Sequence, residues 1–427
     1  MKAAHVFALA LCAALLAAPF WGHIDDIDAQ LYLVVARNLA RDRAWFDLRF
    51  LPGYLPQFRE HLPFGFWPGA AAIRVFGEWA VGPAYALLTL GAIAVSAQIS
   101  GRLRGASAAL ATLVLLGTCE SIWQYGGRLL LDPPLMLFAT AAAGAALADR
   151  WIAAGLLGGI AVLIKGPFGL LPLVCVALAR KRPAGAAAVI AACLPLAIFL
   201  LVDPGSSWRS GYLHGQLLAS ASGERTEGHT EWWFLPAVIA GRFWPGLPFL
   251  LFGFWQARRD VRLRPLAMAC AFALLLLCLP PRKWGNHAYV VFPLLGALAG
   301  AAAGPLLERI RPRLVTVATA TAAVIAWILS AAGAGRLVLQ PPCAFSTVLG
   351  QPLDALPKGR DMLLVAPEVD VLALAELAAE RDLQPWPEPR LPENPSLPDA
   401  IAREDSAVPA SWAVVARGGG WSLLRAR

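Results

Sequence analysis

The chain has 427 residues, of which 58% are hydrophobic and 15% are charged, and its formal net charge is +8. Because a soluble domain has about 25% charged residues, this chain carries too little charge to coat a surface that faces water, and its mean hydropathy of +0.60 agrees. The basic residues stand in short clusters between long apolar runs, which excludes a soluble nucleic-acid-binding protein and favours an all-α, polytopic membrane protein.

The apolar runs give the expected spans. We expect about eleven transmembrane helices, at residues 3–22, 80–101, 106–125, 129–148, 151–164, 167–179, 184–202, 232–255, 265–280, 287–306 and 314–334. The first run follows Lys2 and ends near Trp21 without a small-residue cleavage site, so we expect a retained helix, with a secretory signal as the alternative. The stretch 62–77 is short and interrupted by Pro and Gly, which predicts partial insertion at the membrane interface.

Basic residues mark alternate loops between these spans. They are Arg102, Arg104, Arg150, Arg180, Lys181, Arg182, Arg258, Arg259, Arg262, Arg264, Arg309, Arg311 and Arg313. By the positive-inside rule these loops and the N-terminus are cytoplasmic. The loops 23–63 and 203–231 and the C-terminal tail are then expected outside the cytoplasm.

The last part of the chain, residues 335–427, is richer in Pro and in charge. Strand-like patterns at 362–366, 412–418 and 421–427 and a helix-like pattern at 371–382 predict a small extramembrane α/β domain, with a Pro-rich excursion at 385–398. We therefore expect a transmembrane domain at 1–334, with its first outer loop at 23–66, and this small domain at 335–427.

The first outer loop concentrates the acidic residues. Asp25, Asp26 and Asp28 follow the first span, and a helical pattern then places apolar residues (31, 34, 35 and 39) opposite polar ones (37, 38 and 41). This pattern predicts an amphipathic helix lying in the interface. Asp28 would stand at its positively polarised N-terminus, where the ordinary role of an aspartate is to cap the helix.

The same loop resembles a known family. The stretch DAQLYLVVARNL (28–39) resembles the first-loop motif of glycosyltransferases of GT-C architecture that use polyprenol-phosphate sugars, the bacterial relatives of protein O-mannosyltransferases and of lipid A aminoarabinose transferase. FREHLPFGFW (58–67) resembles the family's Glu-Lys-Pro-Pro-x-x-x-Trp stretch. Further blocks follow in order: Arg128 with Asp132, residues 158–167, residues 232–245, and residues 283–293.

Three positions depart from the family pattern. Ala29 stands where a Glu usually follows the Asp, His61 stands in place of Lys, and Leu62 replaces a Pro. Asp25 and Asp26 are additional acids available for the role of the missing Glu. The departures bear on the identity of the base and of the sugar.

The resemblance implies a GT-C fold and a sugar transfer from a polyprenyl-phosphate donor, undecaprenyl phosphate in a bacterium, to a hydroxyl group of lipid A, a glycan or a protein. The reaction would take place at the periplasmic face of the inner membrane. Asp28 is implied as the general base that takes the proton of the acceptor, and Glu60 as a second carboxylate that orients acceptor or sugar. Cationic groups would stabilise the leaving phosphate.

The substrate-binding candidates come from the blocks that carry the resemblance. They are Asp25, Asp26, Tyr32, Arg37, Arg59, His61, Arg128, Asp132, Lys165, Arg242, Lys283, His287 and Tyr289. For several of these residues a purely structural role is an alternative to substrate binding. Lys165 and Lys283 suit snorkelling at helix ends, and the four-residue spacing of Arg128 and Asp132 suits an ion pair.

The sequence carries weaker signals for a metal site and for other classes of function than for a glycosyltransferase. His61, His214, His229 and His287 fall on the expected outer face but match no metal-binding spacing, so no cofactor is expected and a divalent cation is the alternative. A transporter or flippase for a lipid-linked substrate usually shows inverted repeats, and none is visible. Ala29 and His61 keep open an inactive relative that serves as a binding partner.

Overall fold

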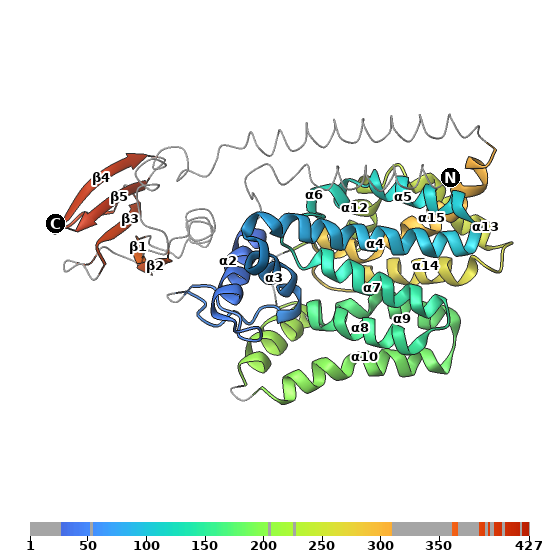
Figure 1. Cartoon of the computed structure of the whole chain (residues 1–427), viewed down its shortest axis with the longest axis horizontal. Coiled ribbons are helices and arrows are strands. Elements are labelled where there is room, and N and C mark those ends of the chain that lie inside the picture. The colour runs from blue at the N-terminus through green and yellow to red at the C-terminus, as the bar shows by residue number, and fades with distance from the viewer. Residues whose placement is uncertain are drawn as a thin grey trace. The chain divides into compact units, whose positions relative to one another are not determined.

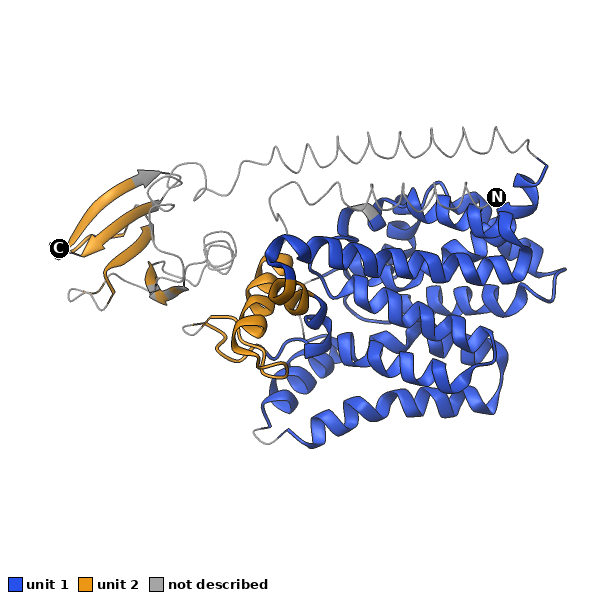
Figure 2. Ribbon diagram, in the orientation of Figure 1, with its two compact units in different colours: residues 1–21, 59–68, 76–331 blue, residues 22–58, 69–75, 332–427 orange. Residues whose placement is uncertain are grey.

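The computed structural model describes residues 27–51, 54–203, 206–224, 228–309, 361–365, 384–388, 392, 397–403, 406–418 and 421–426. The chain forms two compact units, one of residues 1–21, 59–68 and 76–331 and one of residues 22–58, 69–75 and 332–427 (Figure 2). The expected spans 3–22 and 314–334, the expected helix 371–382, and both Asp25 and Asp26 lie outside the described residues.

The first unit is a bundle of helices. Its described elements are η2 (Pro63–Gly65), η3 (Glu78–Ala80), α4 (Val81–Arg104), α5 (Ala106–Gly117), α6 (Glu120–Tyr125), α7 (Asp132–Leu147), α8 (Trp151–Lys165), η4 (Gly166–Leu170), α9 (Leu171–Arg180), α10 (Pro183–Leu201), η5 (Arg209–Leu218), α11 (Ala219–Ser222), α12 (Phe234–Arg242), α13 (Leu247–Ala257), α14 (Arg264–Cys278), η6 (Gly285–Val291) and α15 (Phe292–Leu307). The long helices α4, α7, α8 and α10 pack in that order, side by side (Figure 1).

Helix α15 forms the centre of this bundle. Residues 292–304 are all buried, and the helix packs against α5, α13 and α4. A Cβ atom added at Gly300 would lie 1.9 Å from Oγ1 of Thr112, and one added at Gly304 would lie 2.7 Å from the backbone of Ala108. Small residues at this spacing therefore let α5 and α15 approach closely, as in the interfaces of membrane helices.

Four apolar stretches are long enough to cross a membrane, namely Glu78–Arg104, Trp151–Arg180, Pro183–Leu201 and Gly285–Leu307. A fifth is present if α12 and α13 count as one broken span, because the chain bends by 112° between them. Pro245 lies between the two helices and cannot donate the backbone hydrogen bond that would continue α12, whereas Pro248 stands in the first turn of α13, where proline is tolerated. Helices α5 and α14 are shorter apolar helices, and the expected number of eleven spans stays a prediction.

The stretch Trp151–Arg180 turns back on itself at Gly166. The backbone there has φ +62, and Gly158 on α8 faces Leu173 on α9. A straight helix would hold those two residues roughly 22 Å apart, so α8 and α9 form an antiparallel hairpin. The break expected around Lys165 and Pro167 is therefore present.

The span expected at 106–125 is interrupted, which corrects the sequence interpretation. Helix α5 ends at Gly117, and α6 begins at Glu120. Cys119 between them has an extended backbone with ψ 117. Thr118, Glu120 and Ser121 are polar residues at this break, but apolar residues continue on both sides of it, so mean hydropathy alone does not reveal it.

The two ends of the bundle differ in chemistry. At one end of α4, Nη2 of Arg104 lies 2.5 Å from Oδ2 of Asp260. At the other end, the hydroxyl of Tyr85 donates to the carbonyl of Gly65 at 2.7 Å. A rise of about 1.5 Å per residue separates these ends by roughly 28 Å. The basic turns after α4 and α13 therefore meet at the same end.

The second unit contains α2 (Ile27–Asp42), residues 69–75 of α3 (Trp67–Phe76), and a C-terminal sheet. The helix expected in the first outer loop is confirmed as α2. Its residues 31–36 are all buried, so protein covers this half of the helix on every side. A helix lying in the interface would instead expose one face.

The C-terminal sheet has the order β2-β1-β3-β5-β4. The strands are β1 (Asp361–Val365), β2 (Gln384–Glu388), β3 (Asp399–Arg403), β4 (Trp412–Gly418) and β5 (Trp421–Ala426). Strand β1 runs parallel to β2 and β3, while β5 runs antiparallel to β3 and β4. The strands expected at 362–366, 412–418 and 421–427 correspond to β1, β4 and β5.

The Pro-rich excursion expected at 385–398 was wrong in part, because it contains most of β2. Pro385 and Pro387 pair with Met362 and Leu364 of β1. Strand β2 lies at the sheet edge, where proline is tolerated because no further strand needs its missing N–H group. The core beneath the sheet consists of Leu363, Ala400, Ala402, Trp412 and Leu424.

Candidate functional site

A buried ion pair joins two of the expected site residues. Nζ of Lys165, the last residue of α8, donates to Oδ1 of Asp132, the first residue of α7, at 2.9 Å. Asp132 is only 4% exposed. It stands in the first turn of α7, where the helix N-terminus is positively polarised. The ion pair therefore ties Asp132 to Lys165 and not to Arg128.

Two guanidinium groups lie close to the aromatic ring of Tyr125. Cζ of Arg128 lies 5.7 Å and Cζ of Arg242 lies 5.6 Å from the ring centroid. Both distances suit cation–π attraction. The same ring meets Tyr289 edge-on at 5.0 Å, and the hydroxyl of Tyr289 donates to the carbonyl of Ser121 at 2.8 Å.

Residues of η6 connect these two groups. The ring of His287 lies 5.3 Å from the ring of Phe168, which follows Lys165 by three residues in the chain. Tyr289, two residues further, contacts Tyr125. The structure thus brings together six expected site residues, which we call the cationic cluster: Arg128, Asp132, Lys165, Arg242, His287 and Tyr289.

Arg59 is held by the segment that follows α10. Its Nε donates to Oγ of Ser207 at 3.2 Å, and its guanidinium lies 4.5 Å from the ring of Trp208. Oδ2 of Asp203 accepts the backbone N–H of Trp208 at 2.6 Å and so fixes this segment. Glu60 and His61 come next in the chain and are half-buried.

The same segment reaches the turn beside Lys165. The hydroxyl of Tyr212 lies 1.8 Å from the position that a Cβ atom would take at Gly166. Burial raises the pKa of Tyr212 above its usual value, so the phenol stays neutral. Residues 203–212 therefore contact both Arg59 and the Lys165–Gly166 turn.

Lys283 occupies a different setting. It is 2% exposed, its Nζ donates to the carbonyl of Thr230 at 3.4 Å, and its backbone exchanges two hydrogen bonds with His229. Its side chain therefore faces the segment before α12, and none of these contacts involves the cationic cluster.

Three of the expected residues of the first outer loop, Asp28, Tyr32 and Arg37, lie on α2. Asp28 is exposed in the first turn of the helix, and Arg37 is half-buried. Tyr32 is buried, and its ring meets Phe58 edge-on at 6.3 Å. Tyr32 thus helps to pack the end of the loop against the helix.

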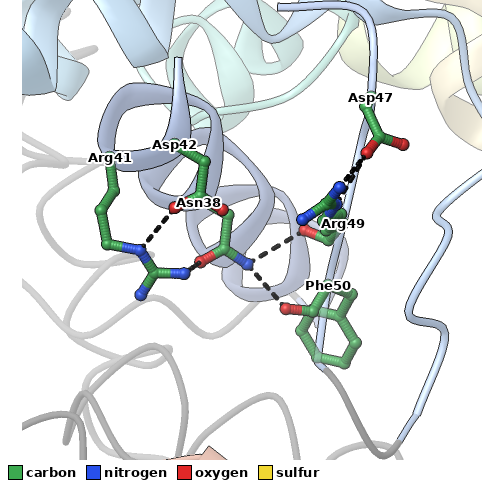
Figure 3. Close-up of polar contacts among 6 residues, drawn as sticks. All are labelled: Asn38, Arg41, Asp42, Asp47, Arg49 and Phe50. Atoms are coloured by element: carbon green, nitrogen blue, oxygen red, sulfur yellow. Dashed lines mark hydrogen bonds and ion pairs between the residues drawn. The ribbon is translucent and has the colours of Figure 1, made fainter. Parts of the chain in front are cut away.

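The polar face of α2 holds the loop that follows it (Figure 3). Nδ2 of Asn38 donates to the carbonyls of Arg49 and Phe50, at 3.1 and 2.7 Å. Arg41 donates to Oδ1 of Asn38 at 3.0 Å and orients the amide. Asn38, which falls within the motif of the first outer loop, thus has a structural task.

Comparison with known proteins gives similarity in structure only. No family model matches the sequence, and no curated protein matches it significantly. The crystal structure of ArnT from Cupriavidus metallidurans bound to undecaprenyl phosphate matches with a TM-score of 0.75 and 17% identity, over 98% of this chain and 97% of that one. This chain has the ArnT fold. The apo state of that ArnT matches with a TM-score of 0.72 and 18% identity, over the same shares of the two chains.

A more distant match is the archaeal oligosaccharyltransferase AglB from Archaeoglobus fulgidus, in complex with an inhibitory peptide and a dolichol-phosphate. Its TM-score is 0.52 and its identity 13%, over 93% of this chain and 69% of that one. ArnT and AglB share the GT-C architecture. The fold expected from the first-loop motif is therefore confirmed.

The part of the chain that the structure describes contains no cluster of metal-ligating side chains. No group of three His, Cys, Asp or Glu side chains there is placed to hold an ion. The divalent cation named as an alternative stays untested.

Sequence reasoning missed several residues that shape the site in this ArnT fold. Tyr125 organises both arginines but ended an expected span, and Ser207 and Trp208 stood in a loop without a motif. In the sequence, only the arginines themselves, which stand near aromatic residues, pointed to these contacts.

Proposed function

We propose that the protein is an integral-membrane glycosyltransferase. It moves a sugar from a polyprenyl-phosphate donor, of the undecaprenyl type, to a hydroxyl group of lipid A, a glycan or a protein. The observation that carries this proposal is the cationic cluster at one end of a bundle with the ArnT fold, because an ArnT of that fold was solved with undecaprenyl phosphate bound.

The guanidinium groups suit the phosphate of the donor. Arginine pairs with phosphate through parallel N–H groups, and Nη1 of Arg242 is buried without a hydrogen-bond partner among the described residues. Lys165 is already paired with Asp132, so Arg128 and Arg242 are the main phosphate ligands in this proposal. They stabilise the negative charge that develops on the leaving group. The other cationic candidates, Arg37, Arg59, His61 and Lys283, take supporting roles.

In the proposed reaction the acceptor oxygen attacks the anomeric carbon while the bond from that carbon to the phosphate oxygen breaks. Asp28 takes the acceptor proton as general base, and Glu60 orients the acceptor or the sugar. Asp25 and Asp26 are further acids of the same loop. A single displacement inverts the configuration at the anomeric carbon.

The proposed reaction site is periplasmic. The basic turns Arg102–Arg104 and Arg258–Arg264 lie at the bundle end remote from the cationic cluster. Because cytoplasmic loops are enriched in Lys and Arg, that arrangement supports a multi-pass protein of the bacterial inner membrane with a cytoplasmic N-terminus. The transmembrane domain is then 1–334, and the small domain 335–427 is periplasmic.

Transfer assays with membranes test the proposal. The wild-type protein, Asp28→Asn and the matched control Asp42→Asn, at the other end of α2, are each supplied with radiolabelled polyprenyl-phosphate sugars. We expect transfer by wild type and control and a loss of at least a hundredfold in Asp28→Asn, in line with the removal of a general base.

Other outcomes of this assay separate the alternatives. Equal transfer by all three proteins would remove Asp28 from the mechanism and direct attention to Asp25, Asp26 or Glu60. No transfer by wild type with any donor would favour an inactive relative. Movement of labelled donor across the membrane without transfer would favour a flippase.

A further inference from the structure

Two half-buried amide side chains beside the cationic cluster each bury an oxygen atom that accepts no hydrogen bond from the described residues. Oε1 of Gln124 on α6 and Oδ1 of Asn286 on η6 are buried, and neither has a hydrogen-bond partner in the described part of the chain. Burying a polar group without a partner costs free energy, so most such groups in folded proteins are paired. Two orphaned amides on neighbouring elements therefore indicate a ligand that supplies the missing partners.

Each amide is the chain neighbour of a residue that lies close to the guanidinium of Arg242. Gln124 precedes Tyr125, on whose ring Arg242 rests at 5.6 Å. Asn286 follows Gly285, where an added Cβ atom would lie 3.6 Å from Nη2 of Arg242. Tyr289 joins η6 to α6 through its hydrogen bond to Ser121. The two amides thus stand on elements that meet at one arginine.

We propose that Gln124 and Asn286 bind the hydroxyl groups of the sugar carried by the donor. This inference rests on the proposed function, in which Arg242 holds the phosphate. The sugar is joined to that phosphate through its anomeric carbon, so the elements that meet at this arginine also lie next to the sugar ring.

The chemistry of the amides favours a sugar over the other parts of the donor. A hydroxyl group both donates and accepts, and so does an amide, whereas a phosphate dianion prefers charged donors. The polyprenyl chain offers no hydrogen bond at all. His287, whose Nδ1 is also buried and without a partner among the described residues, adds a third polar atom on η6.

Binding measurements on the purified full-length protein in nanodiscs test this inference. The probes are undecaprenyl phosphate and the same lipid carrying the sugar that wild type transfers. The variants are Gln124→Met and Asn286→Leu, which keep the side-chain size and remove the amide. The control is Gln98→Met, an exposed glutamine in the groove between α4 and α5.

We expect each variant to weaken binding of the sugar-loaded lipid by about tenfold, as the loss of a hydrogen bond to a substrate hydroxyl group does, and to change binding of the sugar-free lipid less than about twofold. Thermal stability without ligand should stay equal or rise, because the buried oxygens that are removed accept no hydrogen bond from the described residues. Gln98→Met should match wild type in all three measurements.

Three results would overturn the inference. Equal weakening for both lipids would assign the amides to the phosphate or to the fold, and unchanged binding of both would remove them from the site. Lower stability without ligand would show a structural role. Failure of the proposed function looks different, because the wild-type protein would then bind neither lipid.

Discussion

Lys165 and Asp132 pair at 2.9 Å between the end of one helix and the start of another. Each residue belongs to a separate block of the sequence resemblance, and the fold brings the two blocks into contact. The carboxylate is almost fully buried, so the pair also fixes the position of α7 beside α8. The packing of α7 against α8 and the geometry of the proposed site therefore both depend on the ion pair between Lys165 and Asp132.

Removal of Lys165 should destabilise the protein. Lys165→Met leaves Asp132 buried without its cation, which costs about 3–5 kcal/mol. We expect a loss of this size in the free energy of unfolding, measured by denaturant titration of the full chain in mixed micelles. The double variant Lys165→Met with Asp132→Leu should recover most of it, since no buried charge remains. A double variant as unstable as the single one would contradict this account.

Gly166 should tolerate no side chain. Its φ of +62 strains any other residue by roughly 1–2 kcal/mol, and a Cβ atom there would overlap the hydroxyl of Tyr212. Gly105 has φ +82, but an added Cβ atom would meet nothing within 4 Å. We therefore expect Gly166→Ala to lower the folded yield far more than Gly105→Ala, measured by fluorescence-detected size-exclusion chromatography.

A second substitution separates strain from overlap. Tyr212→Phe removes the hydroxyl that overlaps the new methyl group, so adding it to Gly166→Ala should raise the yield to that of Gly105→Ala. If the double variant folds no better than Gly166→Ala, the overlap with Tyr212 is not the cause.

Asn38 should hold the loop that follows α2. Asn38→Ala removes two hydrogen bonds to backbone carbonyls, worth together about 2 kcal/mol. We expect faster trypsin cleavage at Arg43 and Arg49, measured on the full-length protein. Asp42→Asn, which alters only an exposed ion pair with Arg41, should cleave at the wild-type rate. Equal rates for both variants would show that the loop is held by other contacts.

The sequence predicted those parts of the structure that depend on local composition. Long apolar runs gave the positions of α4 and α10, and the periodicity after Asp28 gave α2. The break at Cys119 and the edge strand β2 were missed because tertiary packing decides them. In β2, pairing with β1 overrides the low strand propensity of two prolines.

The candidate site shows the same division. The structure brings the blocks around Asp132, Lys165 and Arg242 together, but the sequence does not indicate which residues contact one another. Tyr125 and Tyr289 meet only through the contact of α6 with η6, and neither residue has a local signal for that contact. The sequence predicted a helix lying in the membrane interface, whereas Asn38 on the polar face of α2 binds backbone carbonyls of the loop that follows.

Arg242 should not be replaceable by lysine. Its guanidinium stacks on Tyr125 and presents several N–H groups in one plane, while an ammonium group is a point charge that does neither. We expect Arg242→Lys to weaken binding of undecaprenyl phosphate by about tenfold, or ~1.4 kcal/mol. The measurement is lipid binding to the full chain in nanodiscs. The matched control is Arg102→Lys, in the last turn of α4, which should bind the lipid as wild type does.

The ring under Arg242 gives an independent test of the same contact. Tyr125→Phe keeps the aromatic face and should bind the lipid phosphate within about twofold of wild type. Tyr125→Leu removes the face and with it roughly 0.5–1 kcal/mol of cation–π attraction for each arginine, so its affinity should fall several-fold. If phenylalanine and leucine behave alike, the ring does not position the arginines, and the phosphate must be bound by other cations of the cluster.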